Sequence, residues 1–358
     1  MSSDSVVVIG NGWAALGAVG LLVTQGVEVR WITGSGSRLL APLSFLEWGP
    51  GVEAWGQLAS RFGIDCPEAQ PGFFLREFRN KAFREPMWLK PPTPEAKLEA
   101  RNQTLWLPEQ SLAPLSQARF SITPVEMEVS IRKELLEHRF SNLKVVESVP
   151  VTGFQFGEGE QSPSIVSLAS GERIECSRII YADRWSLLYQ LQGLPKPLLL
   201  LRKREPMGVL QASFVHNQPI AVGVTESFFA PIARDAGDQI ERHVWGCFTS
   251  DGMRSIWTVC LTAEEVEDNH AIAKKLRKLK NTLDKVFESS GMLPEEKGKF
   301  GSTLLEEQVR FEEESLFSEG EPLTEPIQLK GIDQIQFLTD GYGPSWAMAQ
   351  AWAAIVSK

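Results

Sequence analysis

The amino-terminal segment contains a glycine turn of a type that binds phosphate. Gly10-Asn11-Gly12-Trp13-Ala14-Ala15 follows a β-branched run and precedes an apolar stretch. In such a turn the first glycine allows a tight bend, the second lets a phosphate approach the backbone, and the small Ala15 lets the next helix pack closely on the strand. The N–H groups at the helix start then stabilise a pyrophosphate without a charged side chain. We therefore predict that Gly10, Gly12, Trp13, Ala14 and Ala15 bind a dinucleotide.

The elements around this turn have the spacing of a β-α-β unit. We expect a buried strand from Val6 to Ile9, a helix from about Trp13 to Thr24, and a second strand from Val27 to Ile32. The second strand of such units usually ends in an acid that accepts hydrogen bonds from the adenosine ribose, but here that position is Thr33. Its hydroxyl and backbone would then replace the acid.

Two other interpretations of the following segment stay open. Ser35, Ser37 and Arg38 have the chemistry to receive a 2′-phosphate, as in NADP-binding proteins. Alternatively, the segment is a polar loop without a ligand. The sequence around the turn does not choose between these interpretations.

The carboxy-terminal segment again has the order strand, glycine turn, helix. Ile335 to Leu338 is followed by Thr339-Asp340-Gly341-Tyr342-Gly343-Pro344 and then by a helix rich in alanine and methionine. This order resembles the closing element of FAD proteins of the glutathione reductase structural class. The resemblance implies that the cofactor lies against Asp340 and Gly341, with Asp340 contacting the ribityl chain or a phosphate.

Several segments together resemble the flavin amine oxidase and protoporphyrinogen oxidase superfamily. They are Gly10 to Ala18, Val149-Pro150-Val151, Ser170-Gly171-Glu172, Ile179 to Asp183 and Asp340-Gly341. The resemblance implies an α/β fold: a Rossmann-like FAD-binding domain with an inserted α+β substrate domain, and the Val151 backbone beside the adenine. The chain departs from the family pattern at Thr33 and in the shortened glycine loop from Gly34 to Arg38.

The pattern of elements predicts two domains. The FAD domain comprises residues 1–60, 120–190 and 325–358, and the substrate domain comprises 61–119 and 191–324. In the FAD domain, a capping box at Thr123 and Glu126 predicts a helix to about Arg139, followed by strands from Lys144 to Phe156, Ile165 to Leu168, Arg173 to Cys176 and Ile179 to Ala182.

The predicted substrate domain has two parts that differ in composition and in expected structure. Prolines break up the stretch from Cys66 to Pro114, which we expect to be irregular. Within it, Phe73 to Arg79 is either a packing arm or a cover for an acidic substrate. We predict an antiparallel sheet from Met207 to Leu261, with a strand at Ile220 to Val224, then a capping box at Thr262 and Glu265 and a helix to about Phe287. Its cations from Lys274 to Lys280 suggest a solvated face.

Catalytic residues are weakly indicated. A flavin oxidase needs little more than a substrate C–H bond held over the flavin in a dry pocket. Tyr342 and Trp346 flank the closing turn and are candidates for the wall of such a pocket, although most tryptophans are structural and the composition favours packing of both in the core. The histidines lack metal-ligand spacing, and no GxSxG elbow is present, so we predict neither a metal site nor a nucleophilic serine.

Composition narrows the function classes. A net charge of −9 disfavours a broad nucleic-acid interface. The four cysteines are widely spaced, which suits reduced thiols in the cytoplasm, and the apolar stretch from Val6 to Val23 is interrupted by its glycine turn and is not a membrane span. We predict an FAD-dependent oxidoreductase acting on a small organic molecule. The alternatives are a binding protein with a degenerate FAD fold and an NADP-dependent reductase.

Overall fold

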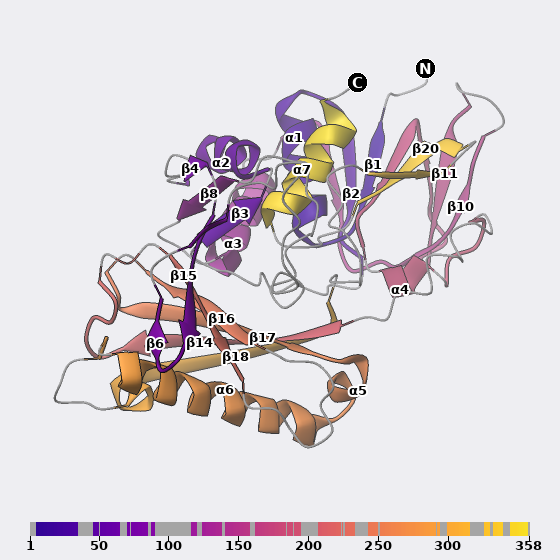
Figure 1. Ribbon diagram of the computed structural model, residues 1–358. Helices are drawn as coiled ribbons and strands as arrows, with labels where there is room; N and C mark the ends of the chain where they lie inside the picture. Colours follow the sequence, from indigo (N-terminus) through magenta and orange to yellow (C-terminus); the bar gives the residue numbers. More distant parts are fainter. Residues whose placement is uncertain are drawn as a thin grey trace, which may run out of the picture.

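The computed structural model has two layered regions (Figure 1): a parallel sheet with helices against it, and a larger, mainly antiparallel sheet covered by one long helix. The structure describes residues 5–34, 46–49, 51–64, 70–71, 73–84, 87–89, 116–119, 124–137, 140–157, 162–183, 185–188, 190–194, 207–222, 224, 226–232, 243–249, 251–290, 292–293, 299–315, 326–329, 332–338 and 344–356.

The parallel sheet has six strands in the order β19-β20-β13-β1-β2-β9. All neighbours are parallel except β19 and β20. The central strand, β1, is apolar on both faces and buried throughout, as its run of valines predicts. The strands are β1 (Val6–Ile9), β2 (Val29–Ile32), β9 (Leu143–Val146), β13 (Arg178–Tyr181), β19 (Ile327–Leu329) and β20 (Ile332–Phe337).

Four helices and one face of the parallel sheet share a single apolar core. These helices are α1 (Trp13–Thr24), α2 (Val52–Arg61), α3 (Pro124–Glu137) and α7 (Pro344–Ile355). Figure 1 shows α1 and α7 side by side, and small residues permit this approach. A Cβ atom at Gly17 of α1 would lie 3.1 Å from the Met348 side chain of α7. Helix α2 also begins close to α7, because a Cβ atom at its N-cap Gly51 would lie 2.0 Å from the Ser345 carbonyl oxygen.

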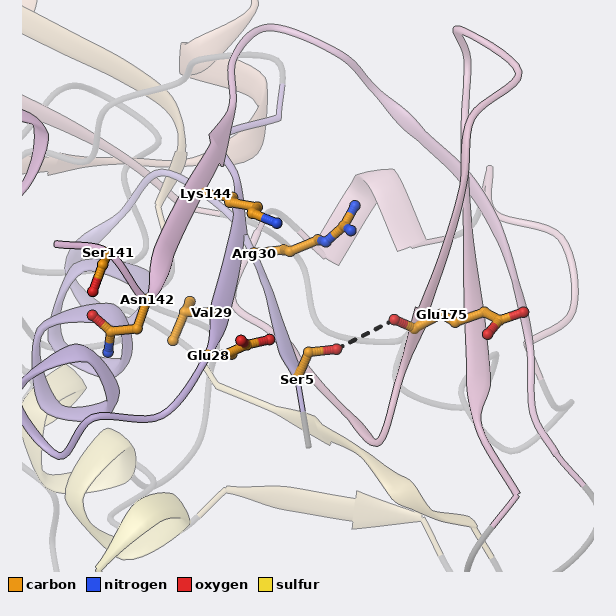
Figure 2. Close-up of a pocket in the computed structure, with 8 residues that line it drawn as sticks. All are labelled: Ser5, Glu28, Val29, Arg30, Ser141, Asn142, Lys144 and Glu175. Atoms are coloured by element: carbon orange, nitrogen blue, oxygen red, sulfur yellow. Dashed lines mark hydrogen bonds between the residues drawn. The ribbon is translucent and has the colours of Figure 1, made fainter. Parts of the chain in front are cut away.

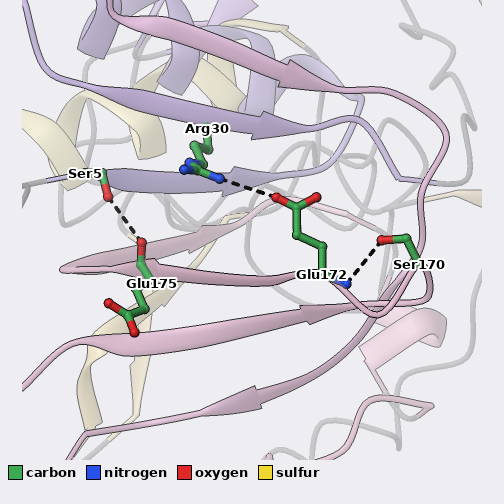
Figure 3. A network of polar contacts seen from close by, with 5 residues as sticks. All are labelled: Ser5, Arg30, Ser170, Glu172 and Glu175. Carbon is green, nitrogen blue, oxygen red and sulfur yellow. Dashed lines mark hydrogen bonds and ion pairs between the residues drawn. The ribbon is translucent and has the colours of Figure 1, made fainter.

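A three-stranded antiparallel meander packs on the parallel sheet through a second apolar core. It consists of β10 (Val151–Gln155), β11 (Ser164–Leu168) and β12 (Arg173–Cys176). Polar contacts fix its position (Figure 3): an Arg30 guanidinium nitrogen lies 3.5 Å from a Glu172 carboxylate oxygen, and the Ser5 hydroxyl donates to the Glu175 carbonyl at 3.3 Å. The first strand predicted here is therefore two strands, β9 and β10, in different sheets.

The larger sheet has the order β18-β14-β17-β16-β15-β5-β6, and β7 also pairs with β5. Its strands are β5 (Phe73–Arg79), β6 (Ala82–Phe83), β7 (Met87–Leu89), β14 (Met207–His216), β15 (Ser227–Pro231), β16 (His243–Phe248), β17 (Arg254–Leu261) and β18 (Leu304–Ser315). Helix α6 (Asn269–Ser290) packs on this sheet around an aromatic core.

This sheet contradicts two expectations and contains one strand that was not predicted. Phe73–Arg79 lies in the stretch expected to be irregular but forms β5, because β15 provides it with a parallel partner. The long strand β18 was not predicted at all. Conversely, no strand forms in the described part of the segment predicted from Ile220 to Val224.

The capping box at Thr262 and Glu265 is present, but it opens only the short helix α5 (Ala263–Val266). Lys275 is not on a solvated face: its side chain is 3% exposed and its ammonium nitrogen lies 2.9 Å from a Glu265 carboxylate oxygen. The remaining elements are β3 (Leu46–Gly49), β4 (Gln70–Pro71) and β8 (Ser116–Arg119), which form a small sheet, helix α4 (Trp185–Leu188) and the 3₁₀ turn η3 (Phe300–Thr303).

Candidate dinucleotide site

The carboxyl ends of five strands form one edge of the parallel sheet. Four backbone hydrogen bonds connect consecutive strands just beyond or at their ends: Leu338 to Tyr181, Ala182 to Ile9, Gly10 to Ile32 and Thr33 to Val146, at 2.7 to 3.1 Å. Helices α1 and α7 both begin at this edge, after β1 and β20. In open α/β sheets, ligands bind outside the carboxyl ends of the strands.

The glycine turn at this edge has the conformation that its sequence predicts. Gly10 has a φ of 132°, and a Cβ atom there would lie 2.2 Å from the Ala182 carbonyl oxygen. Gly12 is the N-cap of α1, with extended backbone and no side-chain cap, and the first turn of α1 carries no acidic residue. The first turn of α1 therefore has no carboxylate that would neutralise the positive end of the helix, as an anion site requires.

Two side chains that the sequence did not single out hold the turn. The Trp31 indole N–H donates to the Gly10 carbonyl at 2.8 Å. The Arg132 guanidinium, from α3, donates to the Asn11 carbonyl at 3.0 Å and lies 4.9 Å from the centre of the Trp31 ring. These contacts fix both carbonyl groups of the bend that leads into α1.

The Asn11 side chain offers a direct test of whether a ligand fits here. Its amide oxygen is buried and has no hydrogen-bond partner among the described residues. Buried polar atoms of native proteins almost always have a partner, which can be a ligand or a water. A cofactor hydroxyl or a bound water at this turn would satisfy Asn11.

Thr33 lies at the end of β2, where the sequence places it, and its hydroxyl already has contacts within the chain. The Thr33 hydroxyl accepts a hydrogen bond from the Ser148 N–H at 3.3 Å, and its backbone N–H donates to the Val146 carbonyl at 3.1 Å. The threonine therefore connects β2 to the segment after β9. Ser35 and Arg38 lie outside the described residues.

The other predicted site residues fall into two groups. Asp340, Gly341 and Tyr342 lie outside the described residues. Trp346 is fully buried in the first turn of α7, and Trp13 is buried against Trp55 with ring centres 5.3 Å apart, so both pack in the core. Ala14 and Ala15 are also buried, and Val151 begins β10 opposite Leu168.

A pocket of about 110 Å³ lies at the opposite, amino-terminal end of the parallel strands (Figure 2). Arg30 and Lys144 lie side by side in it on β2 and β9, with Glu28 and Glu175 among the other lining residues. Its mixed charge and its distance along the strands from the glycine turn separate it from the candidate dinucleotide site.

Three other potentially reactive side chains, Cys176, Cys247 and His216, are buried. Burial raises the pKa of the Cys176 thiol to about 12, and Cys247 is fully buried. Burial lowers the pKa of His216 to about 4, and its ring nitrogens lie 3.0 Å from the Thr303 hydroxyl and 2.8 Å from the Ser255 hydroxyl. Within the described ranges, no group of potential ligands could hold a metal ion, and no helix is long and apolar enough to cross a membrane.

Comparison with solved structures gives the fold. No family model and no curated protein sequence matches the chain. An oxidoreductase from Methanosarcina mazei is similar over 99% of this chain and 100% of its own, with a TM-score of 0.62 and 11% identity.

Two further similar structures name their cofactor or their activity. PqsL from Pseudomonas aeruginosa, a probable FAD-dependent monooxygenase, matches 97% of this chain and 84% of its own, with a TM-score of 0.53 and 14% identity. A putrescine oxidase variant matches 99% of this chain and 98% of its own, with a TM-score of 0.55 and 13% identity. The chain therefore has the mixed α/β fold of FAD-dependent oxidoreductases.

Proposed function

We propose that this protein is an FAD-dependent oxidoreductase that holds the cofactor's pyrophosphate at the glycine turn from Gly10 to Ala15. The observation that carries this proposal is the position of the turn. It lies at the carboxyl edge of the parallel sheet, where Gly12, the N-cap of α1, has no capping side chain and the first turn of α1 has no acidic residue. The N–H groups there provide the donors that a pyrophosphate requires.

Two other segments would contact the rest of the cofactor. The meander containing Val151 would lie beside the adenine, and the segment with Asp340 and Gly341, before α7, would contact the ribityl chain. We propose the two-domain division given above, in which the larger sheet contributes to the substrate site. When bound, FAD would accept a hydride from a C–N or C–C bond of a small organic substrate, as expected for an amine-oxidase-like enzyme.

One observation favours a second candidate function, a binding protein that retains the fold without tight cofactor affinity. The Thr33 hydroxyl bonds the Ser148 N–H, so the side chain at the usual ribose position is already engaged.

Titration of the purified full-length chain with FAD tests the proposal. Saturable binding at one FAD per chain, with the yellow absorbance of a bound flavin, is the expected result. No binding of FAD at concentrations that load other flavoproteins would refute the oxidoreductase proposal and favour the binding protein.

A further inference from the structure

An acidic side chain reaches the end of β2 from a different strand. Asp183 follows β13, and its backbone lies against the glycine turn: a Cβ atom at Gly10 would lie 2.9 Å from the Asp183 nitrogen. The Asp183 side chain extends past this turn. A Cβ atom at Gly34 would lie only 2.4 Å from the Asp183 Oδ2 atom. The carboxylate therefore lies beside the residue that directly follows Thr33.

The Asp183 side chain crosses the end of the strand that carries the glycine turn. Asp183 follows β13 and Gly34 follows β2, and in the sheet β1 lies between these two strands. The Asp183 side chain thus spans the carboxyl end of β1, which is where a dinucleotide would cross the sheet edge. Gly34 has no side chain, which leaves room for the carboxylate, and its φ of 62° is one that glycine adopts readily.

We propose that Asp183 supplies the carboxylate that binds the adenosine ribose, in place of the acid that β2 lacks. The proposal rests on the dinucleotide function proposed above. A carboxylate has two oxygens and accepts hydrogen bonds from both hydroxyls of a ribose, whereas the Thr33 side chain has a single oxygen. A negative group at this position also repels a 2′-phosphate, so Asp183 selects FAD-type over NADP-type dinucleotides.

Binding of ADP and its deoxy analogues to the cofactor-free full-length protein tests this role. ADP contains the pyrophosphate and the adenosine ribose but no flavin, so calorimetry reads the ribose contact without activity. We expect wild type to bind ADP about 10-fold to 100-fold more tightly than 2′-deoxy-ADP or 3′-deoxy-ADP, the range for a hydrogen bond to a charged group. ADP with an added 2′-phosphate should bind more weakly than ADP.

The isosteric variant Asp183→Asn isolates the charge. In this variant ADP should bind as weakly as the deoxy analogues bind to wild type, and the penalty for the 2′-phosphate should shrink. Asp333→Asn is the matched control, because it makes the same change at an exposed carboxylate near the amino-terminal end of β20, away from the turn; its ADP affinity should equal that of wild type.

The results that would contradict the role of Asp183 differ from those that would contradict the proposed function. If Asp183→Asn binds ADP as tightly as wild type, the ribose role is wrong while the FAD proposal stands. If wild type binds ADP and its deoxy analogues equally, the role is wrong even if the variant does not fold. If wild type binds neither ADP nor FAD, the proposed function itself fails, and the role of Asp183 fails with it.

Discussion

The Trp31 indole donates a hydrogen bond to the Gly10 carbonyl at 2.8 Å, in a fully buried position. Trp31 is on β2 and Gly10 is at the end of β1, so this bond joins the glycine turn to the neighbouring strand. The Arg132 guanidinium lies 4.9 Å from the centre of the same indole and donates to Asn11. The shape of the turn therefore depends on side chains from two other elements.

Replacing Trp31 by Phe tests this support. The ring remains apolar, but the Gly10 carbonyl loses its indole donor, so we expect the free energy of unfolding to fall by about 1 to 3 kcal/mol and FAD affinity to weaken. Urea unfolding and FAD titration measure the two effects. Trp352→Phe is the control, because Trp352 is exposed on α7. Equal stabilities of the two variants would show that the indole bond contributes nothing.

Substitutions at Gly10 and Gly26 distinguish the cost of backbone strain from the cost of steric overlap. Both have positive φ, but a Cβ atom at Gly26 meets nothing within 4 Å, whereas one at Gly10 would overlap the Ala182 carbonyl oxygen. We expect Gly26→Ala to cost about 1 to 2 kcal/mol from backbone strain alone. Gly10→Ala should cost more, because β1 and β13 must also separate. Thermal unfolding of both variants gives the comparison, and a smaller loss for Gly10→Ala would contradict the described packing.

His216 predicts a pH dependence of stability. Burial lowers its pKa from 6.5 to about 4, so between these values the unfolded chain binds a proton that the folded chain does not. Stability is therefore retained above pH 6.5 and lost as the pH falls toward 4, by up to about 3 kcal/mol. In urea unfolding from pH 7 to pH 4, His216→Gln should show a flatter dependence than wild type. His270→Gln, at an exposed position, should retain the wild-type slope; identical slopes in all three proteins would exclude His216 as the cause.

Because Lys275 forms a buried ion pair with Glu265, replacing Lys275 should destabilise the protein more than replacing an exposed cation on the same helix. Removing Lys275 leaves the Glu265 carboxylate without its partner on α6, so Lys275→Ala should destabilise the protein by about 3 kcal/mol. The Lys275→Met variant, which retains the aliphatic chain, should lose less. Arg277→Ala removes an exposed cation and should change stability by less than about 0.5 kcal/mol. Similar losses for the alanine variants would mean that Lys275 is solvated after all.

The local parts of the fold could be predicted from the sequence. The bounds of α1 follow from the glycine turn and from the end of the apolar run, and the buried strand β1 follows from its run of β-branched residues. These features depend on neighbouring residues only.

The parts that depend on distant segments could not be predicted. Phe73–Arg79 becomes a strand because of β15, and Lys275 is buried because α5 presents Glu265 to it. At the site, the sequence places the turn and the threonine, but not the side chains that reach them. No sequence pattern places the side chains of Trp31, Arg132 and Asp183 at the turn, and the fold alone brings them there.

Gly12→Asp tests the central claim most directly. Gly12 is the N-cap of α1 with φ −91° and ψ −170°, an extended conformation that aspartate adopts readily and that favours it as a cap. The variant should therefore keep the stability of wild type to within about 0.5 kcal/mol, while its carboxylate occupies the place of a pyrophosphate.

The deciding measurement is the FAD dissociation constant of wild type and of this variant, with thermal unfolding as the check on folding. The account predicts one FAD per chain for wild type and at least about 100-fold weaker binding for Gly12→Asp at unchanged stability. A folded Gly12→Asp variant with wild-type flavin content would contradict the assignment of the pyrophosphate to this turn.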